Sequence, residues 1–342
     1  MFISPTNITT GVGTTPGKTT GTLATGGKGS QGFILDQYPD ADVAFALRRL
    51  STAYNGPMLR VRRNTGGVEA DVHFDSTGSY SLQSPVDNFS SSSNATNLGE
   101  FAASSGYVDV DSMGSSQSMW MTKWYDQSGN GRDGTSTTTS KQPRMLNAGA
   151  ISYATGMGTA GCPCGYLDGG NNVYVANWGT IAHPNTVTVI GQQLTHTTNR
   201  YFWESTTDAT RNILGSAFAG NDSGLFAGSW LVIDNSNTIA GSKIRYGLFN
   251  GADSVFSITD DDGDTTDLYG DAGSNSQYGA RLFSRYDGST SQNMYGYFNE
   301  QIFWPADITA NTPLLSANII NQLNGYYQQQ KLVQDRREKM LV

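Results

Sequence analysis

The sequence predicts an all-β protein built around a large β-sandwich, and three observations support this fold class. Of the 342 residues, 41 are glycine, 11% are aromatic and only 15% are charged. Frequent glycines favour tight turns, and large flat side chains suit the space between two sheets. From about 58 to 303, short runs of alternating apolar and polar residues are separated by clusters of Gly, Asn, Asp and Ser. No internal repeat recurs at a constant period, which disfavours a propeller or a solenoid.

The chain divides into three predicted regions. Residues 1–32 are rich in Gly, Thr and Ser and hold few large apolar groups, so they cannot build a core of their own. We expect them to form an extended assembly arm that becomes ordered on a neighbouring subunit or another protein. The sandwich domain is expected over 33–310, and a C-terminal helix and tail over 311–342.

Two helices are expected beside the strands. Apolar residues recur at helical spacing over 40–54, where Pro39 precedes the pattern and Gly56-Pro57 ends it. The second helix follows Thr312-Pro313, which supplies an N-cap and a first-turn proline. Its apolar stripe consists of Leu315, Ile319 and Leu323.

Charge and cysteine content exclude several classes of protein. A formal net charge of -8 and a pI near 4.8 argue against nucleic acid as a partner. We find no apolar run of membrane-spanning length and no secretory signal pattern at the start. Cys162 and Cys164 are too few for a disulfide framework and have no second pair for a zinc site; a strained bridge and two free thiols both stay open. No cofactor is expected.

The segment Trp124-Tyr125-Asp126-Gln127-Ser128-Gly129 forms a loop motif at the end of a predicted strand. The side chains of Asp126 and Ser128 can bond nearby backbone donors, and Gly129 can supply a positive φ. The motif therefore predicts a tight, self-bonded loop. We interpret Asp126 and Gln127 as residues that hold this loop rather than a ligand.

The loop motif also carries a family resemblance. Together, 46–63 and 124–133 resemble the catalytic domain of fungal α-L-arabinofuranosidase B, which is a concanavalin A-like β-sandwich. The Tyr125–Gly129 pattern and the ending at 298–305 are also similar to LamG-type jelly-roll virion proteins of tailed phages. The resemblance covers about 40–140 and, more loosely, 280–327. It implies a concanavalin A-like (LamG-type) jelly-roll β-sandwich.

The resemblance to the arabinofuranosidases implies two candidate catalytic carboxyl groups. Asp287, in Arg285-Tyr286-Asp287-Gly288, stands at the place of the family's acid/base residue. Glu204 is a positional counterpart of the nucleophile, but the family's Met-Glu-Ala segment and its vicinal Cys-Cys pair are absent. A retaining glycosidase needs its two carboxyl groups about 5 Å apart.

Other candidate sites are weaker. Trp203 and Trp124 are candidates for stacking on a glycan, although most tryptophans of a large sandwich belong to its core. Asp260, Asp262 and Asp264 could bind calcium, but glycine is misplaced for a twelve-residue calcium loop, which favours a solvated acidic loop. The three histidines are not at metal-ligand spacing.

Because the nucleophile motif and the Cys-Cys pair are absent, we interpret the chain as a bacteriophage virion structural protein without enzymatic activity. It would be displayed on the particle as a capsid decoration, another head-attached module or a tail-fibre-like module, and glycan binding on the host surface is compatible with this role. Expected partners are other virion proteins, bound through the arm, and further copies of the chain, with a trimer as one arrangement. Such a protein would be made in the host cytoplasm and released by lysis. The alternative is an arabinofuranosidase-like retaining glycoside hydrolase that uses Asp287 and Glu204.

Overall fold

The computed structural model describes residues 17–19, 33–64, 66–103, 118–154, 163–194, 200–217, 222–233, 242–259, 264–289 and 292–309. These residues form 21 strands, and the only α-helices among them are α1 (Ile34–Gln37) and α2 (Leu98–Ala102). Single 3-10 turns occur at Thr139–Lys141, Asp208–Thr210 and Gly251–Asp253. The prediction of an all-β, jelly-roll-like fold is confirmed.

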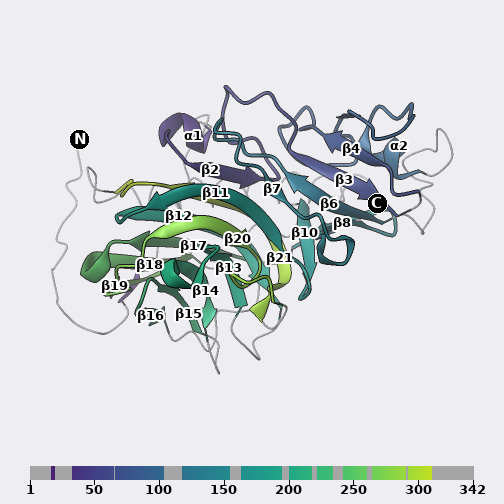
Figure 1. Ribbon diagram of the computed structural model, residues 1–342. Coiled ribbons are helices and arrows are strands. Elements are labelled where there is room, and N and C mark those ends of the chain that lie inside the picture. Colours follow the sequence, from purple (N-terminus) through teal and green to yellow (C-terminus); the bar gives the residue numbers. More distant parts are fainter. Residues whose placement is uncertain are drawn as a thin grey trace, which may run out of the picture.

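The strands form one antiparallel sheet that folds over at β6 (Met119–Trp124) into two layers. The N-terminal half of β6 pairs with β8 (Arg144–Asn147), and its C-terminal end pairs with β7 (Gly134–Thr135). The two layers therefore diverge from a shared strand. In Figure 1 most strands of both layers form the larger lobe, while one end of the first layer, with β3 (Leu59–Arg63), β4 (Glu69–Val72), β6 and β8, extends beyond it together with α2 as a smaller lobe.

The order of the remaining strands follows from their pairing. The first layer runs through β5 (Val86–Asp87), β4 (Glu69–Val72), β3 (Leu59–Arg63), β6, β8, β10 (Pro163–Asp168), β21 (Tyr295–Trp304), β12 (Asn185–Gln193), β17 (Ser242–Phe249), β18 (Ser254–Thr259), β19 (Thr265–Gly270) and β1 (Gly17–Thr19). Beside it, β2 (Val43–Ala46) pairs with β21, and β9 (Ala150–Tyr153) pairs with β8 and β10. The second layer runs through β7, β11 (Val173–Ile181), β20 (Gln277–Leu282), β13 (Arg200–Glu204), β14 (Ile213–Ala217), β15 (Asp222–Phe226) and β16 (Trp230–Ile233).

The main hydrophobic core lies between the two layers. Trp203 of β13 stacks on Phe303 of β21 with ring centroids 5.4 Å apart, and the Trp124 ring of β6 lies 5.0 Å from that of Phe298. A smaller core covers the opposite face of β21, where α1 packs against Trp304 and its neighbours. The strand is therefore buried on both faces from Phe298 to Trp304, including its polar residues Asn299, Glu300 and Gln301.

Residues 40–54 do not form the predicted helix. Val43–Ala46 form the strand β2, and the nearest helix is the single turn α1 before it. Every residue of β2 is buried, because alternate side chains enter the main core and the smaller core. Pairing with β21 along its whole length supplies these backbone groups with partners, and this tertiary context overrides the local helical spacing.

Several predictions fall outside the described residues. They concern the C-terminal helix and tail over 311–342, Cys162, and the aspartates 260 and 262. Of the predicted arm, the structure describes 17–19, which pair with β19 of the same chain. Among the residues described, no helix combines the length and the apolarity that a membrane span needs.

Candidate functional site

The loop motif after β6 is held together by Asp126. Its Oδ1 accepts hydrogen bonds from the backbone N–H groups of Ser128 and of Ala44 in β2, both at 2.9 Å. Its Oδ2 accepts from Ser128 Oγ at 2.7 Å and from the Arg132 N–H at 3.1 Å. Gly129 adopts a φ of 91°, in the region that favours glycine. The carboxylate thus joins its own turn to a distant strand.

Gln127 extends this contact along the chain that follows β2. Its Oε1 accepts from Leu50 N–H at 2.9 Å, and its Nε2 donates to the carbonyls of Ala46 at 3.2 Å and Arg48 at 3.1 Å. Gln127 and Asp126 are both buried. Because their polar atoms are engaged with the chain's own backbone, these two side chains stabilise the fold.

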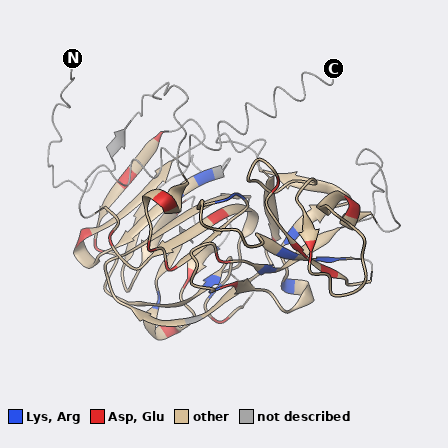
Figure 2. Ribbon diagram, turned by 90° about the horizontal axis from the view of Figure 1, so that it is seen from above, with Lys and Arg blue, Asp and Glu red and all other residues tan. Residues whose placement is uncertain are grey.

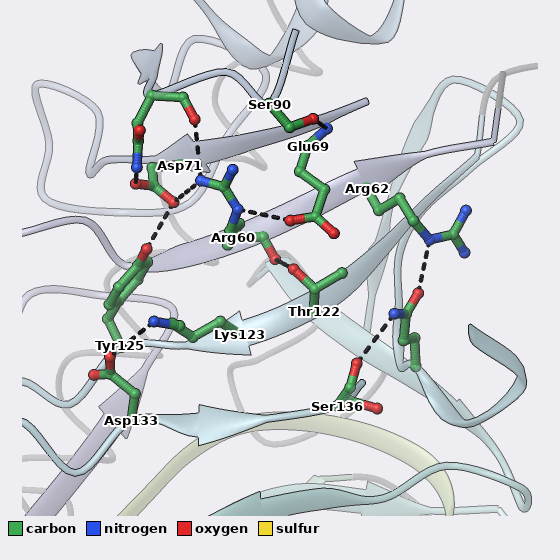
Figure 3. Close-up of polar contacts among 12 residues, drawn as sticks. Arg60, Arg62, Glu69, Asp71, Ser90, Thr122, Lys123, Tyr125, Asp133 and Ser136 are labelled. Atoms are coloured by element: carbon green, nitrogen blue, oxygen red, sulfur yellow. Dashed lines mark hydrogen bonds and ion pairs between the residues drawn. The ribbon is translucent and has the colours of Figure 1, made fainter. Parts of the chain in front are cut away.

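Tyr125 of the same motif belongs to a polar network on the outer face of the first layer (Figure 3). Its hydroxyl donates to Asp71 Oδ1 at 2.7 Å. Arg60 Nη1 donates to the same oxygen at 2.8 Å, and Arg60 Nε donates to Glu69 Oε2 at 2.7 Å. Burial alone would raise the pKa of Asp71, but its hydrogen bonds and the charge of Arg60 lower it overall.

From Arg60 of this network, a row of polar residues continues into the second layer through cross-strand pairs. Lys123, which lies opposite Arg60, faces Thr135 of β7, and Thr135 faces Tyr174 of β11. Arg281 of β20 then lies opposite Tyr174, and Glu204 of β13 lies opposite Arg281. Residues directly opposite in neighbouring strands share one face of a sheet. The row therefore ends at Glu204.

Glu204 is the last residue of β13, and its side chain is fully buried. Its Oε1 lies 2.5 Å from Arg211 Nε, and its Oε2 accepts a hydrogen bond from the Tyr286 N–H at 2.9 Å. The Arg211 guanidinium lies 5.1 Å from the centroid of the Tyr286 ring. Arg281 Nε donates to the Tyr286 carbonyl at 2.9 Å, and this hydrogen bond holds the loop after β20 next to Glu204.

Asp287 follows Tyr286 directly, so it lies in the loop that contacts Glu204. Its Oδ1 accepts from the Ser289 N–H at 2.9 Å, and its Oδ2 lies 3.7 Å from Arg285 Nε. The Asp287 side chain is 40% exposed. The structure therefore brings both predicted carboxyl residues to the end of β13, one buried and one at the surface.

The two carboxyl groups titrate in opposite directions. Burial raises the pKa of Glu204 to about 7, although the charge and hydrogen bond of Arg211 oppose this. Burial also tends to raise the pKa of Asp287. The hydrogen bonds from Ser289 and the charge of Arg285 outweigh this effect and hold the pKa of Asp287 below its usual value. In mildly acidic solution one carboxyl is therefore protonated while the other is ionised.

The arginines of this site were not among the residues predicted from the sequence. Arg211 comes from the connection between β13 and β14, and its pairing with Glu204 depends on how that hairpin closes. Arg281 is placed by the register of β20 against β13. The one local signal was the adjacency of Arg285, Tyr286 and Asp287 in the sequence.

The predicted glycan-stacking tryptophans are core residues. Trp203 and Trp124 have no exposed surface. The Trp203 ring stacks on Phe303, and the Trp124 ring contacts Phe45 at 5.3 Å between centroids. Because neither ring presents a face to solvent, the prediction that they stack on a sugar is corrected.

The predicted calcium cluster is described only in part. Asp264 lies just before β19, and the other two aspartates lie outside the described ranges. Within those ranges, no group of three or more His, Cys, Asp or Glu side chains is placed to hold a metal ion.

Solved structures of known proteins resemble this chain over most of its length. An arabinofuranosidase complexed with arabinofuranosyl-α-1,2-xylobiose matches 87% of it with a TM-score of 0.50 and 16% identity. A mutant GH54 α-L-arabinofuranosidase soaked with 4-nitrophenyl α-L-arabinofuranoside matches the same share with a TM-score of 0.51 and 15% identity. The fold is shared with these arabinofuranosidases. The chain spans 64% of the length of both enzymes, and neither family models nor curated protein sequences give a match.

These neighbours correct the functional interpretation made from sequence. A third solved structure with a TM-score of 0.50 is also a GH54 α-L-arabinofuranosidase, soaked with a cyclic sulfate inhibitor. They contradict the interpretation of the chain as a non-enzymatic virion structural protein, which is therefore withdrawn. The resemblance to the arabinofuranosidases holds at the level of the fold.

Proposed function

We propose that the chain is a glycoside hydrolase related to the α-L-arabinofuranosidases, with Glu204 and Asp287 as its pair of carboxylic acids. The observation that carries the proposal is a buried carboxyl with a pKa near 7, hydrogen-bonded to the loop that bears a second carboxyl of lowered pKa. Glycoside hydrolysis uses such a pair, because one group must be protonated while the other is ionised.

The surroundings of the pair support this chemistry. The guanidinium groups of Arg211, Arg281 and Arg285 lie in and around the site, and Arg211 and Arg285 both rest on the ring of Tyr286. Positive charge at this point favours the ionised form of a neighbouring carboxyl group. Since Glu204 has no exposed surface, access of a sugar to it requires movement of a group that covers it, such as Arg211 or Tyr286.

The family resemblance and the pKa directions assign the two roles within the pair differently. The family resemblance implies Asp287 as acid/base and Glu204 as nucleophile, whereas the pKa directions leave the proton on Glu204. In a retaining enzyme that lacks its nucleophile, azide attacks the sugar directly and gives an inverted glycosyl azide. When the acid/base is missing, azide intercepts the glycosyl-enzyme and configuration is retained. Azide rescue of Glu204→Ala and Asp287→Ala, with the product's configuration determined by NMR, assigns the roles.

The proposal is tested by hydrolysis of 4-nitrophenyl α-L-arabinofuranoside by the purified chain. We expect release of nitrophenolate by the wild-type protein, and kcat/KM lower by about 100-fold or more in Glu204→Gln and in Asp287→Asn, as for loss of an acid/base group. An inactive wild-type protein, or variants as active as the wild type, would remove the proposal.

The chain offers a matched control for each variant. Glu300 is a second fully buried carboxylate paired with an arginine, Arg48 at 2.8 Å, so Glu300→Gln makes the same substitution outside the site. Asp168, like Asp287, accepts a hydrogen bond at 2.9 Å from the N–H two residues later, so Asp168→Asn matches Asp287→Asn. Assayed at a temperature where circular dichroism shows each variant folded, both controls should keep the wild-type rate.

A further inference from the structure

A row of arginine and aromatic side chains crosses the outer face of the first layer, away from the site at Glu204. Strand register places Arg62 of β3 opposite Trp120 of β6, and Trp120 opposite Arg144 of β8. Arg144 lies opposite Tyr166 of β10, and Tyr166 opposite Tyr297 of β21. We call these five residues the Arg–aromatic row.

The row faces outward on every strand. Its five side chains are all half-buried, whereas their neighbours along each strand, such as Val61, Met119, Met145, Leu167 and Phe298, are buried in the main core. Neighbouring strands lie about 4.8 Å apart, so a row across five strands extends over roughly 19 Å. This length suits several units of an extended sugar chain.

Flat contacts join three of the four neighbouring pairs of the row. The Arg62 guanidinium lies 5.1 Å from the centroid of the Trp120 ring, and that of Arg144 lies 4.4 Å from the Tyr166 ring. The Tyr166 and Tyr297 rings are 5.5 Å apart and tilted by 55°. Aromatic rings in such a half-exposed position can stack on the apolar faces of sugar rings.

The arginines of the row are not neutralised by the described residues. Glu69 of β4 lies opposite Arg62 of β3, but its carboxylate binds Arg60, as Figure 3 shows. The Arg62 Nε instead donates to Gln142 Oε1 at 2.9 Å. Arg144 Nε is buried and has no hydrogen-bond partner in the structure. Within the described ranges, no carboxylate lies in ion-pair distance of Arg62 or Arg144.

This local charge is opposite to that of the whole chain, whose formal net charge is -8. Figure 2 shows Lys and Arg in the smaller lobe, where β3, β6 and β8 lie, interspersed with Asp and Glu. Two uncompensated guanidinium groups among flat rings fit a ligand that offers both apolar faces and carboxylates, since Arg binds carboxylate through paired hydrogen bonds.

We propose that the Arg–aromatic row binds a carboxylate-bearing polysaccharide, such as a chain of uronic acid units. The inference rests on the proposed function for the sugar class of the ligand, and it adds the charge of the glycan and the surface that holds it. The row would retain the polymer while the site at Glu204 acts on it.

The test is isothermal titration calorimetry with a hexamer of α-1,4-linked galacturonate and with its fully methyl-esterified form. The two probes share the same sugar rings and differ in charge. On the wild-type chain we expect the acid to bind about tenfold or more tightly than the ester, with the difference shrinking as salt is added. Equal binding of the two probes, or binding of neither, would overturn the proposal, and this comparison needs no variant that must fold.

Variants then locate the surface. Arg62→Gln combined with Arg144→Gln should lower the affinity for the acid hexamer to that of the ester. Arg49→Gln removes an arginine that lies 5.5 Å from the Phe74 ring, outside the row, and should leave the affinity unchanged. An unaltered affinity in the double variant would refute the assignment to this row.

The same measurements separate this inference from the proposed function. Glu204→Gln should abolish hydrolysis of the arabinofuranoside and keep hexamer binding. The double arginine variant should keep hydrolysis and bind the acid hexamer only as weakly as the ester. A wild-type chain that binds the acid hexamer without hydrolysing any arabinofuranoside would retain the row and remove the catalytic proposal.

Discussion

Removal of the Asp126 carboxylate should destabilise the whole sandwich, although the residue lies in a loop. In Asp126→Ala the buried Ala44 N–H loses its acceptor at 2.9 Å, and an unsatisfied buried donor costs about 1–3 kcal/mol. Loss of a hydrogen bond to a charged group costs about 1.5–3 kcal/mol more. The free energy of unfolding should therefore fall by about 3–5 kcal/mol.

Urea denaturation followed by tryptophan fluorescence measures this change, because Trp124 is buried next to the loop. Asp126→Asn keeps the shape and one acceptor oxygen, so it should cost less, about 1–2 kcal/mol. Asp168→Ala is the matched control: its carboxylate caps an exposed turn at Gly170 N–H, and the change should stay near 0.5 kcal/mol. If Asp126→Ala lies within about 1 kcal/mol of the wild type, the loop does not anchor β2 as argued.

Two further predictions concern buried charges. The pKa of Glu204 is raised from 4.5 to about 7, so its contribution to stability is full below pH 4.5 and is lost as the pH rises through 7. The wild-type free energy of unfolding should therefore fall by about 2–3 kcal/mol relative to Glu204→Gln across this window; parallel pH curves in urea denaturation would contradict it. The Arg48–Glu300 pair is bidentate at 2.8 and 3.0 Å and almost fully buried, so Arg48→Met should cost about 3–5 kcal/mol. Adding Glu300→Leu should restore part of that loss; a double variant less stable than Arg48→Met would show that the pair is not the cause.

Strands with a clear alternation were predictable from sequence because their pattern is local. The runs at 58–62, 119–125 and 186–190 correspond to β3, β6 and β12 within a residue or a few. The helix predicted over 40–54 is wrong for the opposite reason. Their apolar spacing is helical, but the backbone partner that decides their conformation is β21, some 250 positions later.

The candidate site was predictable only in part. The positions of Glu204 and Asp287 came from a family resemblance, and the structure brings them together through the Tyr286 amide. The opposing pKa shifts could not be foreseen, because they depend on burial and on Arg211, which reaches Glu204 across a hairpin. The roles of Trp203 and Trp124 were misjudged because composition does not tell a core ring from an exposed one.

The central position of β21 sets the order in which the protein can be completed during synthesis. Residues Tyr295–Trp304 pair with β2, β10 and β12, and the main core closes on Phe298 and Phe303. At about 5–20 residues per second, β2 leaves the ribosome on the order of 10 to 50 s before its partner strand exists. During that interval the apolar strands that await β21 are open to wrong pairing. The yield of folded protein is therefore expected to depend on chaperones that shield nascent strands and on the speed of translation through the second half of the message.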